Sequence, residues 1–579
     1  MRVLGIDVGG TFTDAVLLEG DRIATAKVLT SERQEESVVA AARAVGAHGV
    51  DRFAHGTTIA TNALLEHKGA RTAFVTTAGF EHLLHLRRQT RAHLYRLCAD
   101  HPPPLVALDD CHGVRERISV AGVLEALDLD SLPALEGIEA AAVCTLFSFR
   151  DPTHERAIAD ELRARHPRVH VVASHEVAPE FREYERASTT VADAYLGPVT
   201  ARYFGALGAR CADAGLPEPL VMRSSGGVAS LEEAAAHAAL VLVSGPAAGV
   251  VGGARLAQAA GLENAITFDM GGTSTDVCIV VGGESERSVE RDVAGLPLRL
   301  PTIDLHTVGA GGGSVVWRDP GGATRVGPRS AGATPGPACY GRGGTEPTIT
   351  DANLLLGRLP DRLAGGVELD PAAAERAFAS LDPAAAVEVV NAEMLRALRV
   401  VSVERGHDPR EFALVAFGGA GPLHACALAE ELEIRTVVVP EAAGVLSALG
   451  LVASDERRDH VRSYVCPLDE AGELPPEGEA DLRYRGQSFE LTVPLGDGLA
   501  ERFHRAHEAR YGYAERERPL ELVAVRAADV RAAPALALPR AAPENVAGPA
   551  VVELGGATAW LPPGWEGVRD GTALIVTRE

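Results

Sequence analysis

Short apolar runs joined by a glycine turn open this chain and recur near its middle. Val3 to Val8 is an apolar run of strand length, Gly9-Gly10 turns the chain, and Ala15 to Leu18 is a second apolar run, which together predict a β-hairpin. Residues 266–281, ITFDMGGTSTDVCIVV, repeat the same layout. Because strand, turn and strand all recur, the pattern indicates a duplicated domain.

Helical patterns and strand-like runs alternate between and after the two copies. We expect strands over 72–77, 140–149, 169–173 and 412–417, and helices over 37–45, 152–165, 183–196, 392–404 and 422–431. This alternation predicts an α/β fold with layered sheets.

We expect the chain to divide into three parts. Residues 1–195 would form an N-terminal lobe around the first hairpin, and residues 196–459 a second lobe around the other. Residues 460–579 hold short strand-like runs and one helical stretch, which is typical of a small C-terminal α+β module.

Each hairpin turn carries the same pattern, Asp-x-Gly-Gly-Thr-x-Thr-Asp, at residues 7–14 and 269–276. Glycines let backbone N–H groups converge on an anion, and threonine hydroxyls add donors to phosphate oxygens. Aspartate repels phosphate but can hold it through Mg²⁺ and its waters. Two such hairpins facing each other would bind one nucleotide between two lobes, which explains the repeat.

Other nucleotide-binding architectures fit less well. The chain contains no GxxxxGK[ST] motif, and its glycine cluster at 309–313 lacks the spacing of a Rossmann site. Residues 416–425, AFGGAGPLHA, predict a strand, a glycine turn and a helix start, where a flat ring or a phosphate can approach closely. An adenosine pocket is one interpretation of this segment, and tight packing at a helix start is the other.

The composition restricts the partners. The net charge is 55 − 79 = −24, which disfavours nucleic acid and anionic membranes. Lysine occurs only at 27 and 68, so a nucleotide site that depends on lysine has two candidates. No signal peptide opens the chain, there is no CxxC pair, and the longest uncharged stretch, 238–254, is broken by glycine and proline. We therefore expect a cytoplasmic protein without a membrane span.

These segments resemble the hydantoinase A/5-oxoprolinase family, within the actin, sugar-kinase and Hsp70 type of ATPase. The resemblance runs from residue 5 to residue 451 and includes GIDVGGTFTDAVLL, HGTTIATNALLE, PEFREYERASTT, VSGPAAGVVGGA, FDMGGTSTDV, VGAGGGSV and FGGAGPLHA. The tail, with LRYRGQSFEL at 482–491, is also similar but looks shortened. The resemblance implies two duplicated actin-like (RNase H-like) ATPase lobes around a nucleotide cleft.

The resemblance also implies an activity. Family members use ATP to phosphorylate an amide or ketone oxygen, which makes that oxygen a leaving group before hydrolysis or carboxylation. The leading hypothesis is the A-type subunit of a hydrolase for a cyclic amide (hydantoin, 5-oxoproline or a related lactam), in an oligomer with a B-type subunit. The alternatives are an acetone/acetophenone-type carboxylase subunit, a small-molecule kinase with Asp304 or Asp351 as base, and a nucleotide-gated binding partner with little activity alone.

Matched position by position, the resemblance assigns ATP and Mg²⁺ to specific residues. Asp7 and Asp269 would hold Mg²⁺ through water and act in catalysis, while Asp14 and Asp276 would make structural hydrogen bonds. Contacts to phosphate or adenosine are expected from Gly9, Gly10, Thr11, Thr13, Gly271, Gly272, Thr273, Thr275, Gly311, Gly312, Gly418, Gly419 and Gly421.

Two further features are candidates for substrate chemistry. His55, in HGTT at 55–58, could act as an acid, a base or a donor to a substrate carbonyl, or it could be a structural histidine. The Gly/Pro-rich stretch 327–347 contains Arg329, Arg342 and Cys339, and loops of this kind often cover a substrate. Cys339 has no identifiable base that would make it a nucleophile.

Overall fold

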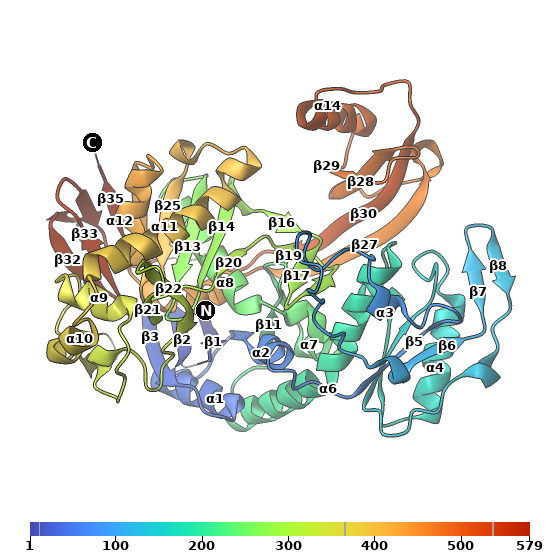
Figure 1. Cartoon of the computed structure of the whole chain (residues 1–579), viewed down its shortest axis with the longest axis horizontal. Coiled ribbons are helices and arrows are strands. Elements are labelled where there is room, and N and C mark those ends of the chain that lie inside the picture. The colour runs from blue at the N-terminus through green and yellow to red at the C-terminus, as the bar shows by residue number, and fades with distance from the viewer. Residues whose placement is uncertain (11, 364–365, 535–537, 579) are drawn as a thin grey trace.

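Two sheets with the same internal order of strands form the two lobes (Figure 1). The computed structural model describes residues 1–10, 12–363, 366–534 and 538–578. The first lobe has the order β3-β2-β1-β4-β11, with bounds Arg22–Leu29, Phe12–Glu19, Arg2–Val8, Arg52–Thr57 and Leu220–Met222. The second has the order β15-β14-β13-β25-β26, with bounds Glu284–Ser285, Thr275–Val281, Ala265–Met270, Ala413–Phe417 and Thr436–Pro440.

Strand directions also agree between the lobes. β1 is antiparallel to β2 and parallel to β4, and β13 is antiparallel to β14 and parallel to β25. The register agrees as well, because Asp7 pairs with Asp14 and Asp269 pairs with Asp276. The predicted α/β fold with duplicated lobes is confirmed.

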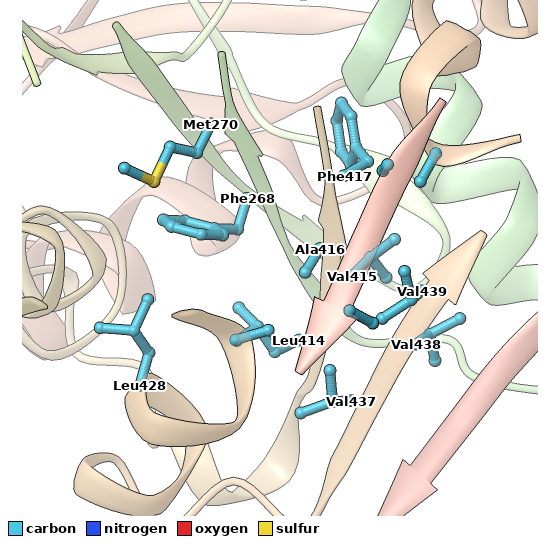
Figure 2. Close-up of a cluster of buried hydrophobic side chains, with 14 of the residues drawn as sticks. Phe268, Met270, Leu414, Val415, Ala416, Phe417, Leu428, Val437, Val438 and Val439 are labelled. Atoms are coloured by element: carbon cyan, nitrogen blue, oxygen red, sulfur yellow. The ribbon is translucent and has the colours of Figure 1, made fainter. Parts of the chain in front are cut away.

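Buried strands hold the second hairpin in place (Figure 2). All residues of β25 are buried, as expected for a central parallel strand with both faces covered. Phe268 and Met270 of β13 lie on the side of Leu428, which belongs to α12 (Gly421–Glu431). Phe417, at the end of β25, packs against α8 (Ser244–Ala259), where a Cβ on Gly249 would lie 2.9 Å from its ring. The carboxyl ends of β13 and β25 are therefore anchored by packing on both faces.

Two glycine-containing helices cross between the lobes. α8 follows the strands of the first lobe, and α13 (Leu446–Val452) follows β26 of the second. A Cβ on Gly450 of α13 would lie 1.9 Å from the Ala248 carbonyl oxygen of α8, so only glycine permits this approach. Each helix also packs on the other lobe. α13 lies against β1, because a Cβ on Gly5 of β1 would lie 2.1 Å from the Ala448 oxygen of α13. α8 lies against β13, because a Cβ on Gly253 of α8 would lie 2.9 Å from Thr267 Cγ2 of β13. The crossing thus sets the distance between the two hairpins.

A four-stranded sheet is inserted into the first lobe. Its order is β10-β9-β5-β6, with bounds His170–Ala173, Ala140–Cys144, Thr72–Thr77 and Cys111–Val114. The adjoining helix α6 (Glu183–Asp213) extends well beyond the predicted end at 196, although it contains Pro198. The Thr200 hydroxyl donates back along the helix to the carbonyls of Leu196 and Gly197 (3.2 and 3.0 Å), shortly after the proline that interrupts the backbone ladder.

The last part of the chain contributes to both large sheets. β27 (Glu456–Pro467) and β30 (Leu520–Arg531) extend the first sheet and run toward α14 (Leu499–Tyr511), at the upper right of Figure 1. β35 (Ala573–Thr577) instead pairs with β26 in the second sheet. The expected module at 460–579 is therefore shared between two sheets, and the boundaries at 195 and 459 remain predictions.

Within the described ranges, no helix is long and apolar enough to cross a membrane.

The helix crossing predicts a stability difference between two glycine substitutions. Gly450→Ala places a methyl group against the α8 backbone, which should destabilise the fold by about 1–3 kcal/mol. Gly205→Ala, in α6, meets no atom within 4 Å and should be neutral or stabilising by roughly 0.5–1 kcal/mol. Chemical denaturation measures both variants. Equal stability of the two would contradict a close-packed crossing.

Candidate active site between the hairpins

Polar residues form one row across each hairpin. In the first lobe, pairing places Asp7, Asp14 and Lys27 next to one another on β1, β2 and β3. In the second lobe, Asp269 and Asp276 are followed by Thr307 of β20 (His306–Val308), which pairs with β14. Residues paired across neighbouring strands point to the same face of the sheet, so each row forms a continuous polar strip.

The outer aspartates have partners within the protein. Lys27 Nζ lies 2.6 Å from Asp14 Oδ1, and the Thr307 hydroxyl donates to Asp276 at 2.6 Å. Asp14 and Asp276 are therefore engaged in holding each hairpin to its third strand.

The inner aspartates, Asp7 and Asp269, lie in a different environment from Asp14 and Asp276. Burial raises the pKa of Asp7 to about 7, and the Asp14 carboxylate adds to the rise. Burial likewise raises the pKa of Asp269 to about 8, with further contributions from Asp276 and, from across the gap, Asp7. Asp7 Oδ1 is buried and accepts no hydrogen bond from any described residue. The two inner aspartates are thus partly buried and close enough to influence one another, and Asp7 has an oxygen free for a ligand.

A glycine of the neighbouring parallel strand makes room for each inner carboxylate. A Cβ on Gly56 would lie 2.4 Å from Asp7 Oδ1, and a Cβ on Gly418 would lie 2.4 Å from Asp269 Oδ1. Gly418 also has φ +79°, which favours glycine independently. The HGTT and FGGAG segments therefore share one role: each supplies a glycine that leaves room for an inner carboxylate. The sequence does not reveal this role for Gly56, because only the tertiary structure shows which strand lies beside Asp7.

The two turns are closed in the same way and leave N–H groups available. The N–H of Gly9 donates to the Phe12 carbonyl (2.9 Å), and that of Gly271 donates to the Ser274 carbonyl (3.0 Å). The N–H groups of Gly10, Gly272 and Thr273 donate to no carbonyl among the described residues, and these three residues are exposed. Thr11 lies outside the described residues.

Two threonines that we expected at the phosphate are engaged elsewhere. The buried Thr275 hydroxyl donates to the Ala310 carbonyl at 2.7 Å. The buried Thr13 hydroxyl lies 3.0 Å from that of Thr30, which donates to the Gly9 carbonyl, so Thr13 is the donor in this pair. Both side chains stabilise their hairpins, and we do not propose phosphate contacts for them.

The glycine cluster at 309–313 braces the second turn. The N–H groups of Gly312 and Gly313 donate to the carbonyls of Gly271 and Gly272 (3.0 and 2.7 Å), and a Cβ on Gly311 would lie 2.7 Å from Gly271 O. Gly311 and Gly312 therefore hold the second turn in its conformation.

The segment predicted to contact adenosine, residues 416–425, lies beside the same hairpin. The Ala420 N–H donates to the Met270 carbonyl (2.9 Å), and α12 begins at Gly421, near the end of β13. Gly419 is exposed, and a Cβ there would meet no atom within 4 Å. The positive end of the α12 dipole and the exposed Gly419 thus lie next to the second turn, where a ligand could approach them.

His55 does not join this group. Its ring is fully buried, with Nδ1 3.1 Å from the Ile6 carbonyl and Nε2 2.8 Å from the Tyr203 hydroxyl. A carbonyl only accepts, so Nδ1 carries the proton, and burial lowers the pKa of His55 to about 4. The neutral imidazole makes two hydrogen bonds and lies on the opposite face of β4 from Gly56. This arrangement fits a structural histidine, and we do not propose His55 as catalytic.

Other candidate residues have structural partners. Cys339 is buried, and burial raises the pKa of its thiol. Asp351 accepts from the Cys339 N–H (2.7 Å) and the Thr348 hydroxyl (2.7 Å), while Asp304 pairs with Arg405 (2.6 Å). Neither aspartate is positioned as a free base.

The stretch 327–347 begins next to the second turn. The Ala331 N–H donates to the Gly313 carbonyl (2.8 Å), and Gly313 in turn donates to Gly272. Arg329 pairs with Glu346 across the stretch. The loop is thus tied to the phosphate turn at its start, and its role as a substrate cover remains a prediction.

The donor set fits a hydrated divalent cation. Mg²⁺ prefers oxygen ligands, keeps several waters and binds through one or two carboxylates together with phosphate. The described residues include no group of three or more His, Cys, Asp or Glu side chains able to hold a metal ion. Asp7 and Asp269 would therefore hold the ion in company with waters and a nucleotide.

The raised pKa values predict how the stability of the metal-free protein depends on pH. A carboxyl group whose pKa is about 7 or 8 in the folded state and ~3.9 when unfolded binds more protons folded than unfolded. Its stabilising contribution is complete below pH ~4 and is lost as pH rises through 7 to 8. In buffer with chelator, the melting temperature should therefore fall between pH 6 and pH 9.

The Asp269→Asn variant should show a smaller fall, because the amide does not ionise. Asp21→Asn, in the exposed turn after β2, is the matched control and should behave like the wild type. Identical pH profiles for Asp269→Asn and the wild type would contradict the assignment.

Comparisons with known proteins place the chain in a family. A family model described as "Hydantoinase/oxoprolinase N-terminal region" matches residues 3–166, and one described as "Hydantoinase/oxoprolinase" matches residues 186–460. An uncharacterized protein of Methanocaldococcus jannaschii is 37% identical, with 90% of this chain and 86% of that protein covered.

Relatives with named activities cover most of the chain. Caprolactamase subunit alpha of Pseudomonas jessenii is 34% identical, with 90% of this chain and 85% of that subunit covered. A crystal structure of ATP-dependent caprolactamase from the same organism superposes with a TM-score of 0.87 at 31% identity, covering 99% of each chain. Acetophenone carboxylase gamma subunit of Aromatoleum aromaticum is 35% identical over 77% of this chain and 67% of that subunit. The chain therefore belongs to the hydantoinase/oxoprolinase family.

Proposed function

We propose that this chain is the ATP-using subunit of an enzyme that hydrolyses a cyclic amide. The observation that carries the proposal is the pair of duplicated hairpins, each with a partly buried aspartate of raised pKa beside a turn with exposed N–H groups. Such a pair offers carboxylates for a cation and donors for phosphate from both sides of one cleft.

Each part of the site has a role in this proposal. The N–H groups of Gly10, Gly272 and Thr273 bind phosphate oxygens, and the α12 start at Gly419 and Gly421 approaches the adenosine. Asp7 and Asp269 hold Mg²⁺ through water. When bound, Mg-ATP supplies the γ-phosphoryl group; the protein orients that group and neutralises its charge.

The reaction explains why ATP is needed. Resonance makes the carbonyl carbon of an amide a poor electrophile. Transfer of the γ-phosphoryl group to the amide oxygen releases ADP and makes that oxygen a good leaving group. Water then adds to the carbon and the C–N bond breaks, which leaves an acyl phosphate. A second water hydrolyses the acyl phosphate to the carboxylate and inorganic phosphate. ATP hydrolysis thereby drives ring opening.

The choice of a cyclic amide is supported by the extent of the similarity. Caprolactamase subunit alpha and the caprolactamase structure match this chain along nearly its whole length, including the strands after residue 456. The acetophenone carboxylase relative supports a second candidate, in which a ketone oxygen is phosphorylated before carboxylation. Because both named relatives are subunits, we also propose a B-type companion subunit.

The test is phosphate release from Mg-ATP, measured with a panel of cyclic amides and with a co-expressed companion subunit. One amide should stimulate release, and Asp7→Ala or Asp269→Ala should reduce it by roughly 10²- to 10³-fold, because each removes a group that organises charge at the phosphate. Asp21→Ala should retain wild-type activity.

Gly56→Ala offers a subtler variant that leaves both aspartates in place. Its methyl group would push on Asp7 Oδ1, so stimulated release should fall while the fold persists. Stimulation only by a ketone with bicarbonate would assign the chain to the carboxylases, and no turnover with any compound would refute both candidates.

A further inference from the structure

The two polar rows differ at one position. Asp7 and Asp14 are followed by Lys27, whereas Asp269 and Asp276 are followed by Thr307. This difference is notable because the chain of 579 residues contains lysine only at 27 and 68. One of the two lysines therefore lies in the polar row that crosses the first hairpin close to its turn.

Lys27 is held near the cleft by two contacts. Its Nζ lies 2.6 Å from Asp14 Oδ1 and 5.2 Å from the centre of the Phe12 ring, and Phe12 follows the turn directly. The side chain keeps 30% of its exposure, so the ammonium group is anchored but still reaches solvent. Burial raises the pKa of Asp7, Asp14 and Asp269, and the Lys27 charge opposes part of that rise in all three.

The charge of a nucleotide makes such a cation necessary. A triphosphate that enters this cleft meets the carboxylates of Asp7, Asp14 and Asp269, which repel it. One Mg²⁺ offsets only part of this repulsion. Lys27 is the cation that these three carboxylates share, and its flexible stem lets the ammonium group bind a carboxylate and a phosphate oxygen together.

We propose that Lys27 binds a phosphate oxygen of the nucleotide from the side of the first lobe, and that Asp14 is the residue that positions it. The proposal rests on the proposed ATP-dependent function. It gives the first hairpin a charged donor that the second hairpin lacks, so the two turns bind the polyphosphate unequally. The Lys68 ammonium group, 73% exposed and paired with Glu66 at 2.6 Å, has no such location and serves as an internal control.

The scarcity of lysine allows a direct chemical test. Pyridoxal phosphate condenses with a lysine amine, releasing water, and borohydride reduces the imine to a stable secondary amine. After treatment of the full chain, peptide mass spectrometry separates labelling at Lys27, Lys68 and the N-terminus. We expect Lys27 to be labelled and to be protected by Mg-ATP, while Lys68 is labelled equally with and without it.

Binding of radiolabelled ATP is measured on the same sample. It separates failure of the Lys27 assignment from failure of the proposed function. If ATP binds and Lys27 is labelled equally with and without it, the assignment of Lys27 is overturned while the nucleotide site stands. If ATP does not bind the wild-type chain, the proposed function fails and the role of Lys27 falls with it.

Variants test the same contact without chemical modification. Lys27→Ala should weaken ATP binding by about 10- to 100-fold, the value of a lost charge-assisted hydrogen bond, and should leave adenosine binding unchanged. Lys27→Arg should recover part of the loss, because the charge returns in a bulkier planar group. Lys68→Ala should match the wild type. An equal loss for ATP and adenosine in Lys27→Ala would indicate a purely structural role and refute the proposal.

Discussion

Partial burial of two carboxylates, one on each hairpin, is the constraint on which the rest of this structure depends. Burial raises the pKa of both Asp7 and Asp269, and the nearby Asp7 carboxylate adds to the rise for Asp269. A fold tolerates such a pair only if protons or a cation neutralise it. The cost of holding these groups is thus linked to the proposed function, in which a divalent cation bound with a nucleotide would relieve it.

Close backbone approach is what keeps the pair in position. Gly56 and Gly418 make room for the carboxylates, while Gly450 and Gly5 let the central helices approach each other and β1. Each central helix leaves one lobe and packs on the aspartate-bearing strand of the other, so a side chain at these glycines would also move a hairpin. Packing between lobes and chemistry between hairpins are therefore parts of one arrangement.

The two lobes have the same framework but brace their turns differently. The first turn is held by Thr13 and Thr30 and lies beside Lys27, whereas the second is held by Thr275 and by N–H groups of the 309–313 cluster. The last strands of the chain then join both sheets, β30 on the first and β35 on the second. A duplicated core has thus acquired different surroundings, which suits a ligand that is itself asymmetric.

The sequence by itself determined the features that depend on local pattern. The hairpins, the duplication, the aspartates at the strand ends and the glycine turn before α12 follow from short-range spacing, because turn chemistry and strand periodicity act over a few residues. Only the tertiary structure decided what each side chain touches. It turned Thr13, Thr275 and His55 toward buried partners, brought Gly56 beside Asp7, and placed Lys27 in the acidic row. These outcomes depend on which strands become neighbours, and contacts between segments far apart in the chain leave no local pattern to read.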